Sequence, residues 1–332
     1  MTRTLLLLPL LLCAALAVRP ALAETHPGEA ALVREVAADT GKNAAALTGL
    51  LDRAQYRQSI VDAISRPAEG KPWSEYRPIF LNPARIDAGI DFYVEHRALL
   101  QRISTRYGVP PQYLVAIVGV ETSYGGNTGH YRVLDALATL AFHYPPRAAF
   151  FRGELKTLLE LPADKLAGPV ESLTGSYAGA QGWGQFMPSS IRDYAVDADG
   201  DGRVDLNDSL PDILSSVANY FAAHGWQSGE PVAVRALAGA DPDPVPDYAG
   251  TPPATSVEQF TAAGYAPGEH VNPGQPANLL TLDGDNGDEN WLVFNNFYVI
   301  TRYNKSPRYA MAVQQLAQAI AQGAQAPTEN AR

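Results

Sequence analysis

The chain has 332 residues, of which 25 are Lys or Arg and 35 are Asp or Glu, so its formal net charge at pH 7 is −10. This acidic charge disfavours a nucleic-acid partner, which would call for a basic face, and none is expected. Because 46% of its residues are apolar, the chain can bury a large core, which we expect to be divided into two or three lobes.

The first 23 residues are typical of a secretory signal peptide. An apolar run extends from Leu5 to Ala17, and Ala21-Leu22-Ala23 has the small-x-small spacing of a cleavage site. A membrane span needs about 18 or more apolar residues, but Arg19 interrupts this run. We therefore expect export to the periplasm and a mature N-terminus near Glu24.

The single cysteine, Cys13, lies inside this segment. The mature chain would then contain no thiol, and its stability would depend on the core alone. A lipoprotein needs a small residue before the cysteine, but Leu12 stands there, so an outer-membrane lipoprotein is the less favoured alternative. Two arginines leave with the signal segment, which makes the expected mature charge −12.

Apolar residues recur at helical spacing over residues 27–66 and 83–107, so the N-terminal third is expected to be helical. Pro110 and Pro111 then open a further helix, because proline is favoured in a first helical turn. A last helix is expected over about residues 307–322.

Residues 229–290 differ in composition from the rest of the chain and are rich in Pro, Gly, Asp and Thr. Short extended runs at 231–235 and 278–282 favour a small lobe of strands and turns. A disordered linker is the alternative for this segment.

Glu121 occupies a position on an apolar helical stripe. Leu114, Ile117 and Val118 precede it at the spacing of one helix face. A carboxylate in that position loses hydration, which raises its pKa and allows it to donate a proton near neutral pH. We expect the helix to end at Gly125-Gly126, so that its dipole also disfavours the negative charge. A structural salt bridge to an arginine is the alternative.

Other catalytic classes lack support in this sequence. The six histidines form no His-Glu-x-x-His or comparable metal pattern. The sequence contains no Gly-x-Ser-x-Gly elbow and no phosphate-binding loop, and its one cysteine lies in the signal segment. Carboxylate chemistry is therefore the leading class.

Residues 197–208 read Asp-Ala-Asp-Gly-Asp-Gly-Arg-Val-Asp-Leu-Asn-Asp and fit the twelve-residue EF-hand loop. Position 12 is aspartate where glutamate is usual, and the shorter arm predicts a weaker or rearranged site. A solvated acidic turn is the alternative, and it is the interpretation that we prefer for the second acidic stretch, 283–289. The expected ligands of a structural Ca²⁺ are Asp197, Asp199, Asp201, the carbonyl of Arg203, Asp205 and Asp208.

Five further motifs occur in order along the chain. They are Gly119-Val-Glu-Thr122, Leu134-Asp-Ala-Leu-Ala-Thr139, the glycine-rich stretch 175–189, Ser216-Val-Ala-Asn-Tyr-Phe221 and Asn296-Phe-Tyr-Val-Ile-Thr-Arg-Tyr-Asn304. Together they resemble the lytic murein transglycosylase B family over nearly all of the mature chain.

The resemblance implies a mainly α fold of the α+β type, with a lysozyme-like core, a helical N-terminal lobe and a small β-containing insertion. The expected parts are the signal peptide 1–23, a helical lobe 24–108, a catalytic core 109–228 that includes the loop 197–208, a β-rich insertion 229–290, the C-terminal part of the core 291–322 and a flexible tail 323–332.

The resemblance also implies a reaction, the cleavage of the β-1,4 bond between N-acetylmuramic acid and N-acetylglucosamine of peptidoglycan without water. Glu121 would protonate the leaving oxygen and then act as base while the C6 hydroxyl of the muramoyl residue attacks its own anomeric carbon. Ordinary glycosidases use two carboxylates, and an internal nucleophile explains how one acid can suffice. A hydrolytic muramidase and a non-catalytic, calcium-dependent peptidoglycan-binding protein are the alternatives.

The matched motifs also supply candidate sugar contacts. Aromatic faces pack on the C–H surfaces of sugars, while amides and hydroxyls bind their polar groups. For Tyr220, packing in the core is the alternative. The expected partners are glycan strands, with cell-wall synthases as candidate protein partners, a monomeric state and no organic cofactor. The residues that match substrate-binding positions of the family are Tyr76, Ser176, Gln185, Tyr220, Tyr303, Asn304 and Tyr309.

Overall fold

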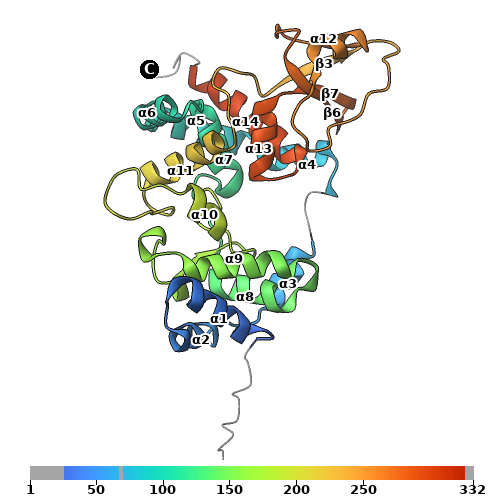
Figure 1. Cartoon of the computed structure of the whole chain (residues 1–332). Coiled ribbons are helices and arrows are strands. Elements are labelled where there is room, and N and C mark those ends of the chain that lie inside the picture. Colours follow the sequence, from blue (N-terminus) through green and yellow to red (C-terminus); the bar gives the residue numbers. More distant parts are fainter. Residues whose placement is uncertain (1–25, 67–69, 326–332) are drawn as a thin grey trace, which may run out of the picture.

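The computed structural model describes residues 26–66 and 70–325. Its helices form two groups, one above the other in Figure 1, and a small sheet lies beside the upper group. The predicted signal peptide and the end of the predicted tail lie outside the described residues. Over the described ranges, no helix has both the length and the apolar character that a membrane span requires.

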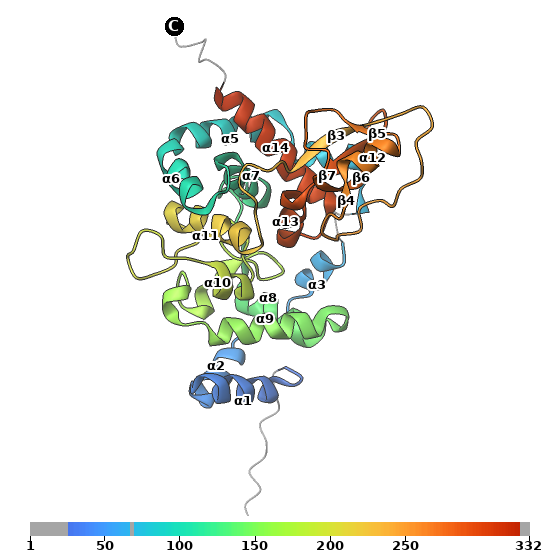
Figure 2. The same ribbon diagram turned by 45° about the horizontal axis from the view of Figure 1, so that its top comes forward.

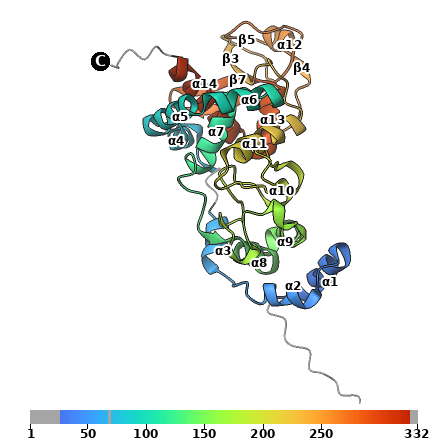
Figure 3. The ribbon, with the colours of Figure 1, turned by 90° about the vertical axis from the view of Figure 1, so that its left-hand side faces the viewer.

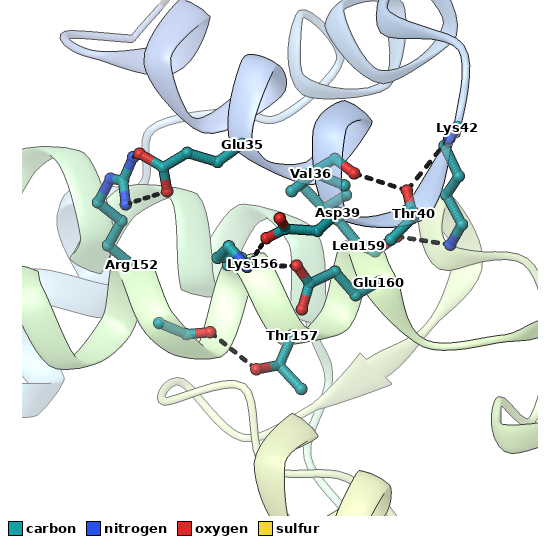
Figure 4. A network of polar contacts seen from close by, with 11 residues as sticks. Glu35, Val36, Asp39, Thr40, Lys42, Arg152, Lys156, Thr157, Leu159 and Glu160 are labelled. Atoms are coloured by element: carbon teal, nitrogen blue, oxygen red, sulfur yellow. Dashed lines mark hydrogen bonds and ion pairs between the residues drawn. The ribbon is translucent and has the colours of Figure 1, made fainter.

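The lower group consists of five helices, with α8 and α9 packed against each other. Leu32 and Val36 of α1 are fully buried, and charged pairs join the same helix to α9 (Figure 4). Arg152 contacts Glu35 at 2.7 Å, and Lys156 contacts Asp39 at 2.7 Å. Exposed pairs of this kind each contribute about 0–1 kcal/mol, so the apolar contact dominates. The helices are α1 (Glu29–Thr40), α2 (Ala44–Leu51), α3 (Gln58–Ile64), α8 (Val133–His143) and α9 (Ala148–Glu160).

The upper group surrounds α7, which is buried on all sides until its last turn. A helix that is apolar all round needs neighbours on every face, and α5, α6, α11 and α14 supply them. Pro110 and Pro111 stand at its start as predicted. The short helix α10 (Pro188–Tyr194) lies between the two groups (Figure 3). The upper helices are α4 (Trp73–Phe80), α5 (Pro83–Glu95), α6 (Arg97–Tyr107), α7 (Pro111–Thr122), α11 (Leu210–Ala223), α13 (Asn295–Tyr303) and α14 (Pro307–Gln325).

The helices of the expected lobe 24–108 do not pack together as one body. α1 and α3 contact α9 and α8, whereas α4, α5 and α6 contact α14, α7 and α11. Helical spacing identifies the apolar face of each helix but not the partner that covers it. The helices were expected over this range and are present, and the division of the chain into a lobe 24–108 and a core stays a prediction.

Five antiparallel strands form the lobe at the upper right of Figure 2, in the order β4-β6-β7-β3-β5. One face packs on α12 (Val257–Ala262), which Ser256 and Gln259 begin with a capping box. This sheet confirms the predicted strands near 231–235 and 278–282, while the acidic stretch 283–289 forms the β6–β7 hairpin. The strands are β3 (Ala233–Ala238), β4 (Thr255–Ser256), β5 (Tyr265–Pro267), β6 (Pro276–Gly284) and β7 (Gly287–Val293), and a separate pair is formed by β1 (Tyr131–Arg132) and β2 (Thr174–Gly175).

Candidate active site

Glu121 is the penultimate residue of α7, immediately before the chain crosses from the upper to the lower group of helices. The helix does not reach Gly125-Gly126 as predicted. It ends at Thr122 because Ser123 and Tyr124 adopt left-handed φ angles of 52° and 59°. The Tyr124 hydroxyl donates to the carbonyl of Arg85 at 2.8 Å, a contact that helps to hold a conformation otherwise costly for non-glycine residues.

Arg85 of α5 closes the end of the helix that carries Glu121. Its guanidinium donates to the carbonyl of Gly119 at 2.6 Å and approaches that of Val120 at 3.4 Å. The last carbonyls of a helix have no partner within the helix, and a cation there opposes the helix dipole. The expected dipole effect on Glu121 is therefore offset, and Arg85 is a site residue that sequence reasoning missed.

Burial raises the pKa of Glu121 to about 7, and a hydrogen bond from Tyr309 acts in the opposite direction. The Tyr309 hydroxyl donates to Oε1 of Glu121 at 2.5 Å. Within the described ranges, Glu121 has no ion pair and no other carboxylate contributes to its pKa shift, so the salt-bridge alternative lacks support. The half-buried side chain can therefore hold or release a proton near neutral pH.

Two tyrosines from the C-terminal helices border Glu121. Burial and the negative charge of Glu121 raise the pKa values of Tyr303 and Tyr309 well above the usual range, so both remain neutral donors. The turn between their helices is ordered by polar contacts. Asn304 accepts from the Ser306 amide at 3.0 Å, and the Ser306 hydroxyl accepts from the Tyr309 amide at 3.3 Å. Asn304 thus fixes the start of α14 and, with it, the position of Tyr309.

The glycine-rich loop joins α7 to α13 beside the acid. The Thr122 hydroxyl donates to the carbonyl of Trp183 at 3.0 Å, and the Tyr303 hydroxyl donates to that of Gly184 at 2.5 Å. A Cβ atom on Gly182 would lie 2.4 Å from the carbonyl oxygen of Leu206, and one on Gly184 would lie 2.9 Å from the Tyr303 hydroxyl. Both glycines are thus required by contacts within the protein.

Ser176 and Gln185, the two polar residues predicted from the family motifs, lie in this loop region. Among the described contacts, neither has a hydrogen bond to Glu121. Ser176 accepts from the amides of Ala178 and Ala180 at 3.2 and 3.1 Å and so stabilises its own turn. Gln185 has a left-handed φ of 50° and donates to the carbonyls of Thr128 and Gly182 at 3.1 and 2.9 Å. It joins the segment after α7 to the glycine-rich loop.

Tyr220 and Tyr76 support the two tyrosines that border the acid. Tyr220 is 7% exposed, donates to the carbonyl of Arg302 at 2.6 Å and lies 4.7 Å from Tyr303 between ring centroids, an arrangement that favours core packing. Tyr76 of α4 is buried and is close enough to Tyr309 to contribute to the raised pKa of that residue. The structure thus brings Glu121, Tyr303, Tyr309, Tyr220 and Tyr76 together.

The acidic loop 197–208 forms a group with a residue outside the predicted set. Carboxylate oxygens of Asp197, Asp199 and Asp212 lie within 4.8 Å of one another. Asp212 is 1% exposed in the first turn of α11 and accepts from the amides of Ala198 and Asp205 at 2.7 and 2.8 Å. Asp208, predicted at position 12, does not belong to this group.

The other predicted ligands line the loop itself. Asp201 accepts from the Arg203 amide at 2.8 Å, and Asp205 accepts from the Asn207 amide at 2.9 Å. Oxygen donors of this kind suit Ca²⁺. An acidic residue in the first turn of the following helix was the sequence signal that could have identified Asp212.

A single carboxylic acid that titrates near pH 7, bordered by neutral phenol donors, defines a site that can protonate a leaving group. Such a site is typical of enzymes that use acid–base chemistry. Residues 25–318 match the model of the Transglycosylase SLT domain family, and the chain belongs to this family of peptidoglycan-cleaving lytic transglycosylases.

The membrane-bound lytic murein transglycosylase B of Escherichia coli is 47% identical to this chain over 249 residues, which cover 75% of this chain and 67% of that protein. The soluble lytic transglycosylase SltB1 of Pseudomonas aeruginosa is 48% identical, with a TM-score of 0.83 over 89% of this chain and 99% of that one. These similarities confirm the predicted family.

Two further solved structures carry ligands. The E. coli lytic transglycosylase Slt35 in complex with calcium is 41% identical, with a TM-score of 0.82 over 90% of this chain and 94% of that one. SltB3 of P. aeruginosa in complex with NAG-anhNAM-pentapeptide is 31% identical, with a TM-score of 0.76 over 89% of this chain and 79% of that one. These neighbours share a lysozyme-like fold, which confirms the predicted fold class.

Proposed function

We propose that this protein cleaves the β-1,4 bond between N-acetylmuramic acid and N-acetylglucosamine without water and leaves 1,6-anhydro ends. The observation that carries the proposal is Glu121, which accepts a hydrogen bond from Tyr309 at 2.5 Å and whose pKa burial raises to about 7, with no carboxylate of the described residues among the causes of the shift. A two-carboxylate glycosidase would hold its second carboxyl group about 5–10 Å away. The membership of the family and the anhydro ligand bound by SltB3 support the same reaction.

In this mechanism Glu121 acts twice. Its protonated form donates to the glycosidic oxygen as the bond from that oxygen to the anomeric carbon breaks. The Tyr309 hydroxyl, 2.5 Å from Oε1, stabilises the carboxylate so formed. The carboxylate then takes the proton of the C6 hydroxyl as this oxygen attacks the anomeric carbon of its own sugar. A pKa near 7 keeps both forms accessible.

We propose substrate contacts for the seven candidate residues, and their position relative to Glu121 ranks them. Tyr309 contacts the acid directly, Tyr303 is close enough to be affected by its charge, Asn304 follows Tyr303 in the chain, and Tyr76 affects Tyr309. These four are the strongest candidates. Ser176 and Gln185 have hydrogen bonds within the protein, so Ser176 would contact sugar through its hydroxyl proton and Gln185 through its amide oxygen. For Tyr220 the structure supports an indirect role through packing against Tyr303.

Product mass tests the proposed reaction. Purified protein is incubated with peptidoglycan, and the released muropeptides are weighed. Anhydro products are lighter by one water than hydrolytic ones and would support the proposal. Hydrated reducing ends would instead indicate a muramidase, and no release from an intact, folded protein would indicate a binding protein. Glu121→Gln serves as the matched inactive control.

We further propose that the loop 197–208 binds Ca²⁺ as a structural ion, as Slt35 was solved in complex with calcium. The carboxylate group of Asp197, Asp199 and Asp212 fits such an ion, because Asp212 is buried close to another negative charge. Asp201, Asp205, Asp208 and the Arg203 carbonyl remain candidate ligands. The ion would stabilise the packing of α11 and take no part in the chemistry.

The proposed reaction also implies where the protein acts and what it binds. We propose that the protein acts in the periplasm on glycan strands, as a monomer. Glycan binding is supported by the complex of SltB3 with NAG-anhNAM-pentapeptide. Association with cell-wall synthases is a further proposal, which co-purification from cross-linked cells would test.

A further inference from the structure

The β6–β7 hairpin reaches the start of α4 through Asp283. The carboxylate Oδ1 of Asp283 accepts from the Trp73 amide at 2.8 Å, and Trp73 is the first residue of α4. The first amides of a helix need acceptors from outside the helix. Pro72 at the N-cap position has no side chain that can accept. The sheet lobe therefore supplies the cap that the local sequence lacks.

The same carboxylate also approaches the helix that carries the partner of the catalytic acid. Oδ1 of Asp283 lies 3.8 Å from the guanidinium of Arg308. Arg308 directly precedes Tyr309, which donates to Glu121. One side chain of the hairpin thus touches the first turns of both α4 and α14.

A second acidic residue of the hairpin contacts α4 at Arg77, the residue that follows Tyr76. Glu289 of β7 contacts Arg77 at 3.9 Å and Arg235 of β3 at 3.0 Å. In the sequence, Tyr76 lies between Trp73 and Arg77, the two residues of α4 that the hairpin contacts, and it contributes to the raised pKa of Tyr309. The hairpin thus contacts α4 on both sides of Tyr76 in the sequence.

We propose that Asp283 is a positioning residue of the active site, which fixes the first turns of α4 and α14 so that Tyr76 and Tyr309 meet beside Glu121. The acidic hairpin is then more than a surface turn, because it couples the sheet lobe to the catalytic tyrosines. The inference rests on the proposed function only where activity is the readout.

The two contacts of Asp283 contribute unequally. Its side chain is 53% exposed, and an exposed ion pair at 3.8 Å is a weak contact. The hydrogen bond to the Trp73 amide is the stronger one, since it satisfies a donor of a fully buried residue. Asp283→Asn keeps an oxygen that can accept and should change activity by less than about twofold, whereas Asp283→Ala removes both contacts.

The test compares Asp283→Ala with Asp288→Ala. Asp288 lies opposite Asp283 in the hairpin register and is exposed, with no side-chain contact to α4 or α14 among the described residues. We expect Asp283→Ala to lower kcat about threefold to tenfold, with a smaller change in KM, as loss of a helix cap implies. Asp288→Ala should behave as the unaltered protein.

Two further measurements separate positioning from general stability. The loss caused by Asp283→Ala should largely disappear in a Tyr309→Phe background, because the two changes act through one contact. A ¹³C-detected titration of the Glu121 carboxyl group should show a higher pKa in Asp283→Ala, since the lowering hydrogen bond from Tyr309 is weakened. Additive losses, or an unchanged titration together with an unchanged kcat, would overturn the proposal.

If Asp283→Ala fails to fold, Asp283→Glu takes its place, because it moves the carboxylate by one methylene; kcat and the Glu121 titration should then change in the same directions but by less. The titration needs no substrate. Hydrated or absent products from the unaltered protein would therefore refute the proposed reaction, while the Glu121 titration would still decide the role of Asp283.

Discussion

Tyr309 donates a hydrogen bond to Glu121 across 2.5 Å and so joins the first turn of α14 to the last turn of α7. The two residues are 188 positions apart in the chain. Burial raises the pKa of Glu121 to about 7, and this bond limits the rise. The balance between the two effects determines the pH range in which the acid can work.

Tyr309→Phe should move the alkaline limb of the pH profile of kcat/KM to higher pH. The first step needs protonated Glu121, so activity falls as the pH rises through the pKa of that group. The Tyr309 hydroxyl lowers this pKa, and its removal therefore raises it. We also expect kcat to fall about tenfold or more, as for other donors to a developing charge. An alkaline limb that stays in place or moves to lower pH would contradict this account.

Glu121→Gln should stabilise the fold at high pH. The pKa of Glu121 is near 7 in the folded protein and 4.5 without its surroundings, so the folded state binds more protons between these values and stability falls as the pH rises through them. Glutamine does not titrate, so the variant keeps its free energy of unfolding. Above pH 7 its gain over the unaltered protein from this source is at most about 3 kcal/mol. Urea unfolding at pH 4 and pH 8 checks the sign, and equal differences at both values would refute it.

Arg85→Met should destabilise the end of α7 by about 1–3 kcal/mol, because the carbonyls of Gly119 and Val120 lose a charged donor in a partly buried setting. Turnover should fall as well, since Glu121 follows these residues directly. Arg85→Lys keeps the charge and should recover part of both losses. Urea denaturation and initial rates on peptidoglycan measure the two effects, and normal values for Arg85→Met would exclude this role.

Gly184→Ala should lower activity, because the added Cβ atom would lie 2.9 Å from the Tyr303 hydroxyl. Gly153→Ala in α9 is the matched control, since no atom apart from its chain neighbours and the backbone of its own helix lies within 4 Å of the added Cβ. The control should be neutral or more stable by about 0.5–1 kcal/mol. Thermal unfolding and initial rates distinguish the two variants. Equal melting temperatures and equal rates would show that activity does not depend on the close approach at Gly184.

Ca²⁺ should raise the melting temperature, and Asp212→Asn should reduce this rise far more than Asp208→Asn. The reason is that Asp212 shares an oxygen cluster with Asp197 and Asp199, whereas Asp208 does not. Ligand binding to the folded state alone stabilises by about 2.7 kcal/mol at a hundred times Kd. Scans with Ca²⁺ and with EDTA measure the difference. A larger reduction of the rise by Asp208→Asn than by Asp212→Asn would instead indicate that Asp208 is the ligand.

Local patterns in the sequence were sufficient for several features. Helical spacing placed Glu121 on a buried stripe, the proline pair marked the start of α7, and extended runs located two strands of the sheet lobe. Each of these signals lies within about two turns or one strand of chain. The chemistry assigned to Glu121 depended on the family motifs, because a buried glutamate alone is compatible with a salt bridge.

Contacts between distant segments were not predictable in the same way. Arg85, Asp212 and Asp283 each act on a helix or loop to which they do not belong. Nothing in their own neighbourhood indicates the partner, since packing decides which surfaces meet. The end of α7 was misplaced for a similar reason, because a hydrogen bond to Arg85 holds Tyr124 in a conformation usually left to glycine.

The most direct test of the central claim is to run the reaction in water enriched in ¹⁸O and to weigh the new muramoyl ends. If Glu121 directs the C6 hydroxyl to the anomeric carbon, the products carry no ¹⁸O, are one water lighter than reducing ends, and are absent with Glu121→Gln. Incorporation of one ¹⁸O atom at each new end would contradict the account and make the protein a hydrolase.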